Sequence, residues 1–151
     1  MRILVDADAC PKVIKELLYR TSKRVQIELI LFANHFFLIP ISPLIKLIKV
    51  PAGFDEADRQ IADATQAGDI VITADIPLAD AVIDKGGVAL NPRGTLYTKE
   101  NIKHTLAMRN IMEQMRENQM ISGGGPSTFN KLDTQALANQ LDKLLTANNL
   151  T

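Results

Sequence analysis

The segment RILVDADACP at residues 2–11 joins a short apolar run directly to two aspartates and then to a proline. Ile3, Leu4 and Val5 form a continuous apolar run, which is typical of a strand buried on both faces. Pro11 suits the first turn of a following helix, where the missing N–H is not needed. A second segment, DIVITAD at residues 69–75, repeats the pattern of an apolar strand followed by an aspartate.

Outside these two segments, the remaining patterns alternate between strand and helix. Further strands are predicted at 25–32, 44–50 and 88–90, although Lys46 and Lys49 leave a helix open for the second of these. Helices are predicted after Pro11 and at 55–67, 77–85, 99–118 and 133–147. The inner face of the long helix is expected to carry Ile102, Leu106, Ile111, Met112 and Met115. Alternating strands and helices predict an α/β protein with three layers (α/β/α) and a mainly parallel sheet.

Composition sets limits on the kind of protein. The chain has 151 residues, of which 46% are hydrophobic, and 17 basic residues balance 17 acidic ones. This length fits one domain over residues 1–151, with the C-terminal helices from about residue 99 packing on it. The single cysteine, Cys10, cannot form an intramolecular disulfide and is expected to be a small buried residue. Without a secretion signal, we expect a cytoplasmic location and no membrane span, because prolines and polar residues interrupt the apolar segment 29–48.

Aspartates follow the predicted strand ends. In open parallel sheets, ligands bind beyond the carboxyl ends of the strands. Asp6 and Asp8 lie at one such end and Asp75 at another, so these three are expected to hold a divalent metal ion. Mg²⁺ or Mn²⁺ suits this oxygen-rich set. Asp55 and Asp58, three apart at a helix start, and Asp80 in the helix after Asp75 are expected to complete the site. Helix capping is the alternative role for each aspartate, whereas Asp69 is expected to serve at the surface or as a cap.

Several other residues are candidates for binding a substrate phosphate. Arg93 lies between Pro92 and Gly94 and could pair with phosphate, or be an exposed turn residue. Gly123, Gly124 and Gly125 could present backbone N–H groups, with Lys131 adding a charge, or form a simple connection. Lysines and arginines on the first helix could face RNA or only solvent. The apolar loop around Phe36 and Phe37 and the methionines of the long helix leave room for a homodimer.

Five motifs occur in order along the chain: DADACP at 6–11, GFDEAD at 53–58, DIVITADIPLAD at 69–80, NPRG at 91–94 and GGGP at 123–126. Together they closely resemble the YaiI/YqxD family of bacterial proteins across essentially the whole chain. That family is similar to the PIN and NYN nuclease domains, which are metal-dependent ribonucleases. The resemblance implies a PIN-like fold and matches Asp6, Asp55 or Asp58, and Asp75 to the acidic residues of those nucleases. Asp8 and Asp80 would be extra or substitute ligands.

These observations favour a metal-dependent ribonuclease that uses aspartates at the C-terminal edge of a parallel sheet. A haloacid-dehalogenase-like phosphatase is an alternative, because Asp6-Ala-Asp8 after a strand fits its motif with Asp6 as nucleophile. A third possibility is a non-catalytic, metal-stabilised domain that binds nucleic acid or protein.

Overall fold

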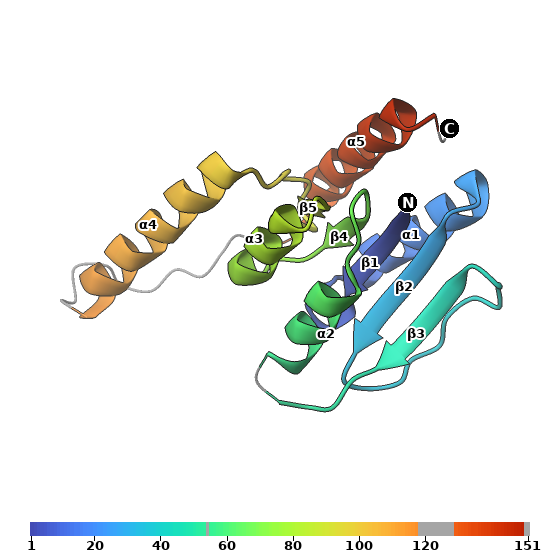
Figure 1. The fold of residues 1–151 in the computed structure, drawn as a ribbon, viewed down its shortest axis with the longest axis horizontal. Coiled ribbons are helices and arrows are strands. Elements are labelled where there is room, and N and C mark those ends of the chain that lie inside the picture. The colour runs from blue at the N-terminus through green and yellow to red at the C-terminus, as the bar shows by residue number, and fades with distance from the viewer. Residues whose placement is uncertain (54, 118–128, 150–151) are drawn as a thin grey trace.

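The computed structural model describes residues 1–53, 55–117 and 129–149, with the backbone alone at 109, 110 and 112–117. Along these residues, strands alternate with helices (Figure 1). The strands are β1 (Arg2–Asp6), β2 (Glu28–Ala33), β3 (Ile45–Lys49), β4 (Ile70–Ile72) and β5 (Val88–Leu90). The helices are α1 (Lys12–Val25), α2 (Glu56–Ala64), α3 (Ile76–Asp84), α4 (Lys99–Glu117) and α5 (Lys131–Ala147), and a short 3-10 turn, η1 (Ala7–Ala9), follows β1.

The strands named above pair in parallel, in the spatial order β3-β2-β1-β4-β5. β1 lies at the centre, where Val5 is paired with Leu31 of β2 on one side and with Ile72 of β4 on the other. The chain builds outward from β1 to β3 and then returns to the other side of β1 with β4. The strand order therefore reverses between β1 and β4, which is the place where open parallel sheets bind ligands.

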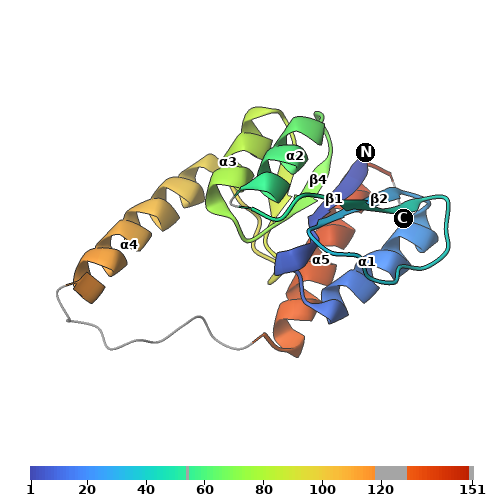
Figure 2. The same ribbon diagram turned by 90° about the horizontal axis from the view of Figure 1, so that it is seen from below.

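Each face of the sheet is covered by helices and has its own apolar core. Ile3 and Val5 point to the face covered by α1 and α5, whereas Leu4 points to the opposite face. The first core includes Leu18 of α1 and Leu141 of α5, and the second includes residues of α2 and α3. Figure 2 shows α2 and α3 on one side of the strands and α1 and α5 on the other. The predicted α/β fold with three layers is confirmed.

Three helix boundaries differ from those expected, and local backbone bonding explains each one. α1 continues to Val25 because Gln26 caps it in the left-handed conformation (φ 57°), so β2 begins only at Glu28. α2 ends at Ala64, since Thr65 is extended and bonds back to the carbonyl of Ile61. α5 begins at Lys131, because Asn130 and Asp133 form a capping box that fixes its first turn.

Segment 44–50, predicted as a strand with a helix as the alternative, is a strand. Ile45–Lys49 pairs with β2 along its whole length, as the edge strand of the sheet. The alternative of a helix at this position is wrong.

Helix α4 leaves the body of the protein. It starts beside α3, where Ile102 is buried in the second core, and then extends away from the sheet (Figures 1 and 2). Leu106 and Ile111, expected on an inner face, are 39% and 45% exposed, so that expectation is wrong for these two residues. Met112 and Met115 lie outside the described side chains.

The loop after β5 is held against α5 at a glycine. Gly94 has a φ of +96°, and its amide donates to the carbonyl of Asn91 at 2.8 Å. A Cβ atom placed at Gly94 would lie 2.6 Å from the backbone carbon of Ala136 and 2.7 Å from the nitrogen of Leu137. The loop and α5 thus approach each other more closely than a residue with a side chain allows.

A buried ion pair links the start of β1 to the start of β4. Asp69, expected to serve at the surface or as a cap, is buried and accepts hydrogen bonds from Arg2 Nη2 at 2.6 Å and from Arg2 Nε. It also accepts from the amide of Gln66 at 2.9 Å, which is a local turn role. The surface position is therefore wrong, because Arg2 supplies the charge that makes burial possible.

Among the residues with described structure, none of the helices combines the length and the apolar character needed to cross a membrane.

Candidate functional site at the C-terminal edge of the sheet

Thr73 joins the two central strand ends. Asp6 is the last residue of β1 and is largely buried, and Thr73 follows β4 directly and is fully buried. The hydroxyl of Thr73 donates to Asp6 Oδ2 at 3.3 Å and accepts from the amide of Asp75 at 3.0 Å. One threonine therefore fixes both aspartates at the predicted edge. Nothing in the local pattern indicates this role, because a threonine that follows a strand is common.

The environment of Asp6 favours its protonated form. Burial raises the pKa of the Asp6 carboxyl, and the hydrogen bond from Thr73 opposes this rise. The neighbouring charges of Asp8 and Asp75 raise the pKa further. Removal of either neighbouring charge would therefore lower the pKa of Asp6.

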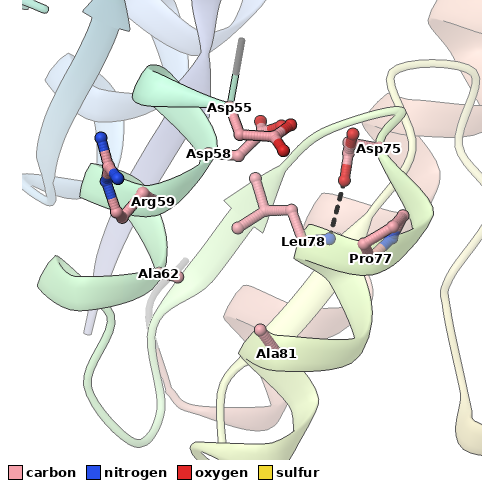
Figure 3. A pocket seen from close by; sticks show the side chains of 8 residues that line it. All are labelled: Asp55, Asp58, Arg59, Ala62, Asp75, Pro77, Leu78 and Ala81. Carbon is pink, nitrogen blue, oxygen red and sulfur yellow. Dashed lines mark hydrogen bonds between the residues drawn. The ribbon is translucent and has the colours of Figure 1, made fainter.

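Asp75 combines a capping role with a place in a pocket. It is the N-cap of α3, and its Oδ1 accepts from the amide of Leu78 at 2.8 Å (Figure 3). The capping alternative is thus realised for this residue. At the same time, Asp75 lines a pocket of about 480 Å³ together with Asp55 and Asp58 of the facing helix region.

The side chains of Asp55 and Asp58, at the start of α2, point toward Asp75, as Figure 3 shows. The pKa of Asp58 is raised to about 6, mainly by burial and also by the nearby charges of Asp75, Asp6 and Asp55. Asp55 occupies the N-cap position of α2 in the left-handed conformation, with φ 62°. Such a backbone is uncommon for a residue other than glycine and is often found at functional sites.

A second, smaller hollow of about 210 Å³ is also lined by the start of α2. Asp55 and Asp58 line it as well, so the two hollows share these residues. Asp6 and Asp8 line only the second hollow. Aspartates from β1, η1 and the start of α2 therefore face one connected region of the sheet edge.

Asp8 is held by the loop that follows β2. Its Oδ2 accepts from the amide of Asn34 at 2.9 Å, and its Oδ1 lies 3.2 Å from His35 Nδ1. These contacts fix the turn η1 against the start of the β2–β3 loop.

Asp80 lines neither of these hollows. Lys99 Nζ lies 2.8 Å from Asp80 Oδ1 and also contacts Asp84. A lysine thus neutralises Asp80 and ties α3 to the first turn of α4.

Two of the residues predicted to bind phosphate, Arg93 and Lys131, have other surroundings than the aspartates. Arg93 Nη1 pairs with Asp133 Oδ2 at 2.9 Å, and its guanidinium lies 5.7 Å from the ring centroid of Phe129. Lys131 is exposed at the first residue of α5. Neither residue lines the two acidic hollows. Gly123, Gly124 and Gly125 lie outside the described residues.

Cys10 is buried, as expected. Burial raises the pKa of its thiol to about 12, so the thiolate is scarce at neutral pH. This residue is therefore part of the first core.

Within residues 1–53, 55–117 and 129–149, no three acidic, histidine or cysteine side chains are arranged to hold a metal ion together. The assignment of Asp6, Asp8 and Asp75 as metal ligands stays a prediction. Asp58 and Asp75 line the same pocket, and the charge of Asp75 raises the pKa of Asp58.

Replacing Asp58 with asparagine is expected to stabilise the protein when no divalent metal is present. A carboxyl whose pKa is higher in the folded state binds extra protons there, so the free energy of unfolding falls as pH rises from about 4 to about 6. Because the group is partly exposed, we expect Asp58→Asn to raise stability at pH 7.5 by only about 1 kcal/mol, or about 3 °C in Tm.

Thermal unfolding in EDTA at pH 7.5 and pH 4 measures this effect. The gain should shrink at pH 4, where wild-type Asp58 is itself protonated. Asp63→Asn, an exposed change on the same helix, is the matched control and should leave Tm nearly unchanged. Equal Tm values for the wild type and Asp58→Asn at pH 7.5 would contradict the prediction that ionised Asp58 destabilises the folded protein.

The protein is thus an open parallel α/β protein, and aspartates follow the two strands, β1 and β4, between which the strand order reverses. The sequence model of the family described as "Uncharacterized BCR, YaiI/YqxD family" matches residues 4–147. The chain belongs to this family, as its motifs indicated.

Close relatives extend over nearly the full chain. UPF0178 protein of Maridesulfovibrio salexigens is 56% identical over 146 residues, which is 97% of this chain and 96% of the relative. UPF0178 protein of Shewanella sediminis is 55% identical over 146 residues, covering 97% of each chain. A Burkholderia ambifaria relative is 52% identical over 145 residues, covering 96% of each. No solved structure matches the chain at a significant level.

Proposed function

We propose that this protein is a divalent-metal-dependent nuclease that cleaves RNA at the C-terminal edge of its sheet. The observation that carries the proposal is that Asp55, Asp58 and Asp75 line one pocket, with the side chains of Asp55 and Asp58 pointing toward Asp75 (Figure 3). Burial and the neighbouring carboxylates raise the pKa of Asp58 there to about 6. Carboxyl groups this close repel each other when both are ionised, and either a proton or a cation relieves the repulsion.

The donor set suits Mg²⁺ or Mn²⁺. Mg²⁺ in proteins is commonly bound by one or two carboxylates, with water and substrate phosphate oxygens as the other ligands. Asp58 and Asp75 would supply two such carboxylates, and a protein site with three ligands is not required. When bound, the ion would activate water and offset charge on the phosphodiester.

The remaining residues of the edge have distinct roles in this proposal. Asp6, whose pKa is raised and whose Oδ2 accepts a hydrogen bond from Thr73, would accept a proton from the attacking water. Asp55 adds negative charge where both hollows meet. Asp8 fixes the β2–β3 loop beside the site through Asn34 and His35.

Purified protein incubated with RNA of mixed sequence tests the proposal. We expect cleavage with Mn²⁺ or Mg²⁺, and none in EDTA. The ion should also raise Tm in the wild type, because ligand that binds only the folded state stabilises it, and should do so less in Asp75→Asn. Absence of both cleavage and metal-dependent stabilisation would refute the proposal. Hydrolysis of p-nitrophenyl phosphate with intact RNA would favour the phosphatase alternative, with Asp6 as nucleophile.

A further inference from the structure

The loop between β2 and β3 exposes several large apolar side chains. Phe36 is 72% exposed, and Leu38 and Ile41 are essentially fully exposed, at 98% and 104%. Isolated exposed apolar residues are common, but a group of them on one loop marks an interaction surface.

Two lysines from outside this loop lie over its two phenylalanine rings. Lys15 Nζ of α1 lies 4.3 Å from the ring centroid of Phe37, and Lys49 Nζ at the end of β3 lies 5.3 Å from that of Phe36. The loop therefore carries two pairs of an aromatic ring and a lysine, one beside α1 and one beside the edge strand. We call Lys12, Lys15, Phe36, Phe37 and Lys49 the ring–lysine surface.

A hollow of about 530 Å³ adjoins this surface. It is lined by Lys12, Lys15, Tyr19, His35 and Phe37, and by one carboxylate, Glu16. The lining thus carries more positive than negative charge, in a protein whose net charge is zero. Aromatic side chains together with positive charge are the combination that binds single-stranded nucleic acid, since rings stack on bases and lysines contact phosphates.

The ring–lysine surface continues into the acidic edge. His35 lines the hollow and lies 3.2 Å from Asp8, and Asn34 donates its amide to the same carboxylate. Asn34 and Asp8 in turn line the smaller acidic hollow. A strand lying on the ring–lysine surface would thus lie next to Asp8 at the acidic edge.

We propose that the ring–lysine surface binds single-stranded nucleic acid and leads it to the acidic edge. The idea that the bound strand reaches a catalytic site rests on the nuclease proposed above, whereas binding to the surface needs no metal. Phe36 stacks on an unpaired base, and Lys12, Lys15 and Lys49 contact phosphates on either side. A duplex keeps its bases stacked inside and cannot use the rings in this way.

Fluorescence anisotropy in EDTA tests the proposal without cleavage. The probes are a labelled oligouridine, an oligothymidine of the same length and a duplex. Phe36→Ala should weaken binding of the single strands about tenfold, the effect of losing one stacked base. Lys15→Ala should reduce the slope of log affinity against log salt by about 0.7, which corresponds to one lost phosphate contact. Comparing the two single strands shows whether RNA or DNA is preferred.

Leu132→Ala and Lys103→Ala serve as matched controls, since they remove an exposed apolar residue of α5 and an exposed lysine of α4. Both should leave affinity and salt slope unchanged. Equal binding of the duplex, or unchanged binding by Phe36→Ala and Lys15→Ala, would overturn the proposal. If Phe36→Ala altered only self-association in sedimentation, the surface would be a protein interface and the proposal would also fail.

The two proposals fail in different ways. Binding in EDTA that depends on the ring–lysine surface, without cleavage in Mn²⁺, would refute the nuclease alone. If RNA were cleaved in Mn²⁺ but Phe36→Ala and Lys15→Ala left binding unchanged, only the proposed role of the ring–lysine surface would be refuted.

Discussion

Gly94→Ala is expected to lower the free energy of unfolding by about 4 kcal/mol, or about 12 °C in Tm. The added Cβ would lie 2.6 Å from backbone and side-chain carbons of Ala136, and these atoms belong to the middle of a packed helix. A side chain at a φ of +96° adds backbone strain to this overlap. α5 would have to shift, and Leu137 and Leu141 would lose part of their packing in the first core.

Gly68→Ala is the matched control for this change. Gly68 also has a positive φ, +88°, but no atom lies within 4 Å of a Cβ placed there. It should therefore show only the strain, about 1 kcal/mol. Chemical denaturation of both variants, followed by circular dichroism, measures the difference. Equal losses would show that the close approach to α5 contributes nothing.

Asp6→Asn is expected to reduce metal-dependent RNA cleavage about 100-fold or more, which is typical for loss of a group that transfers a proton. Asparagine has the same shape and can still accept a hydrogen bond from Thr73. Because burial and neighbouring carboxylates raise the pKa of Asp6, removing its charge should leave Tm at neutral pH equal or higher. A loss of cleavage with unchanged or greater stability separates a chemical role from a folding defect.

Asp80→Asn is the control for Asp6→Asn. Asp80 pairs with Lys99 and lines neither acidic hollow, so its loss should leave cleavage nearly unchanged. If Asp80→Asn reduced cleavage as strongly as Asp6→Asn, the acidic edge would not be where the reaction takes place.

The sequence was most informative where a pattern is local. The apolar runs before Asp6 and Asp75 predicted β1 and β4, and parallel pairing then placed both strand ends at one edge. The preference of proline for a first turn and the spacing of apolar residues located the helices, to within a few residues at each end.

Contacts between distant segments could not be predicted in this way. Thr73 bonds to Asp6 and Arg2 bonds to Asp69, and each pair is 67 residues apart in the chain. Neither contact can be recognised from the residues that flank either partner. Asp80 was a candidate by its spacing from Asp75, but its environment is decided by Lys99 on another helix. In the same way, the exposure of Leu106 depends on α4 leaving the body of the fold, which helical periodicity does not record.

The central position of β1 has a consequence for synthesis on the ribosome. β1 pairs with β2 shortly after it in the chain, whereas its other neighbour, β4, is translated only after α1, β2, β3 and α2. Until Ile70–Ile72 emerges, one hydrogen-bonding edge of an apolar strand stays open, and open edges attract other nascent chains. Slower translation just beyond β3 would lengthen that exposure, so codon choice in this stretch should affect how much of the protein reaches its native state.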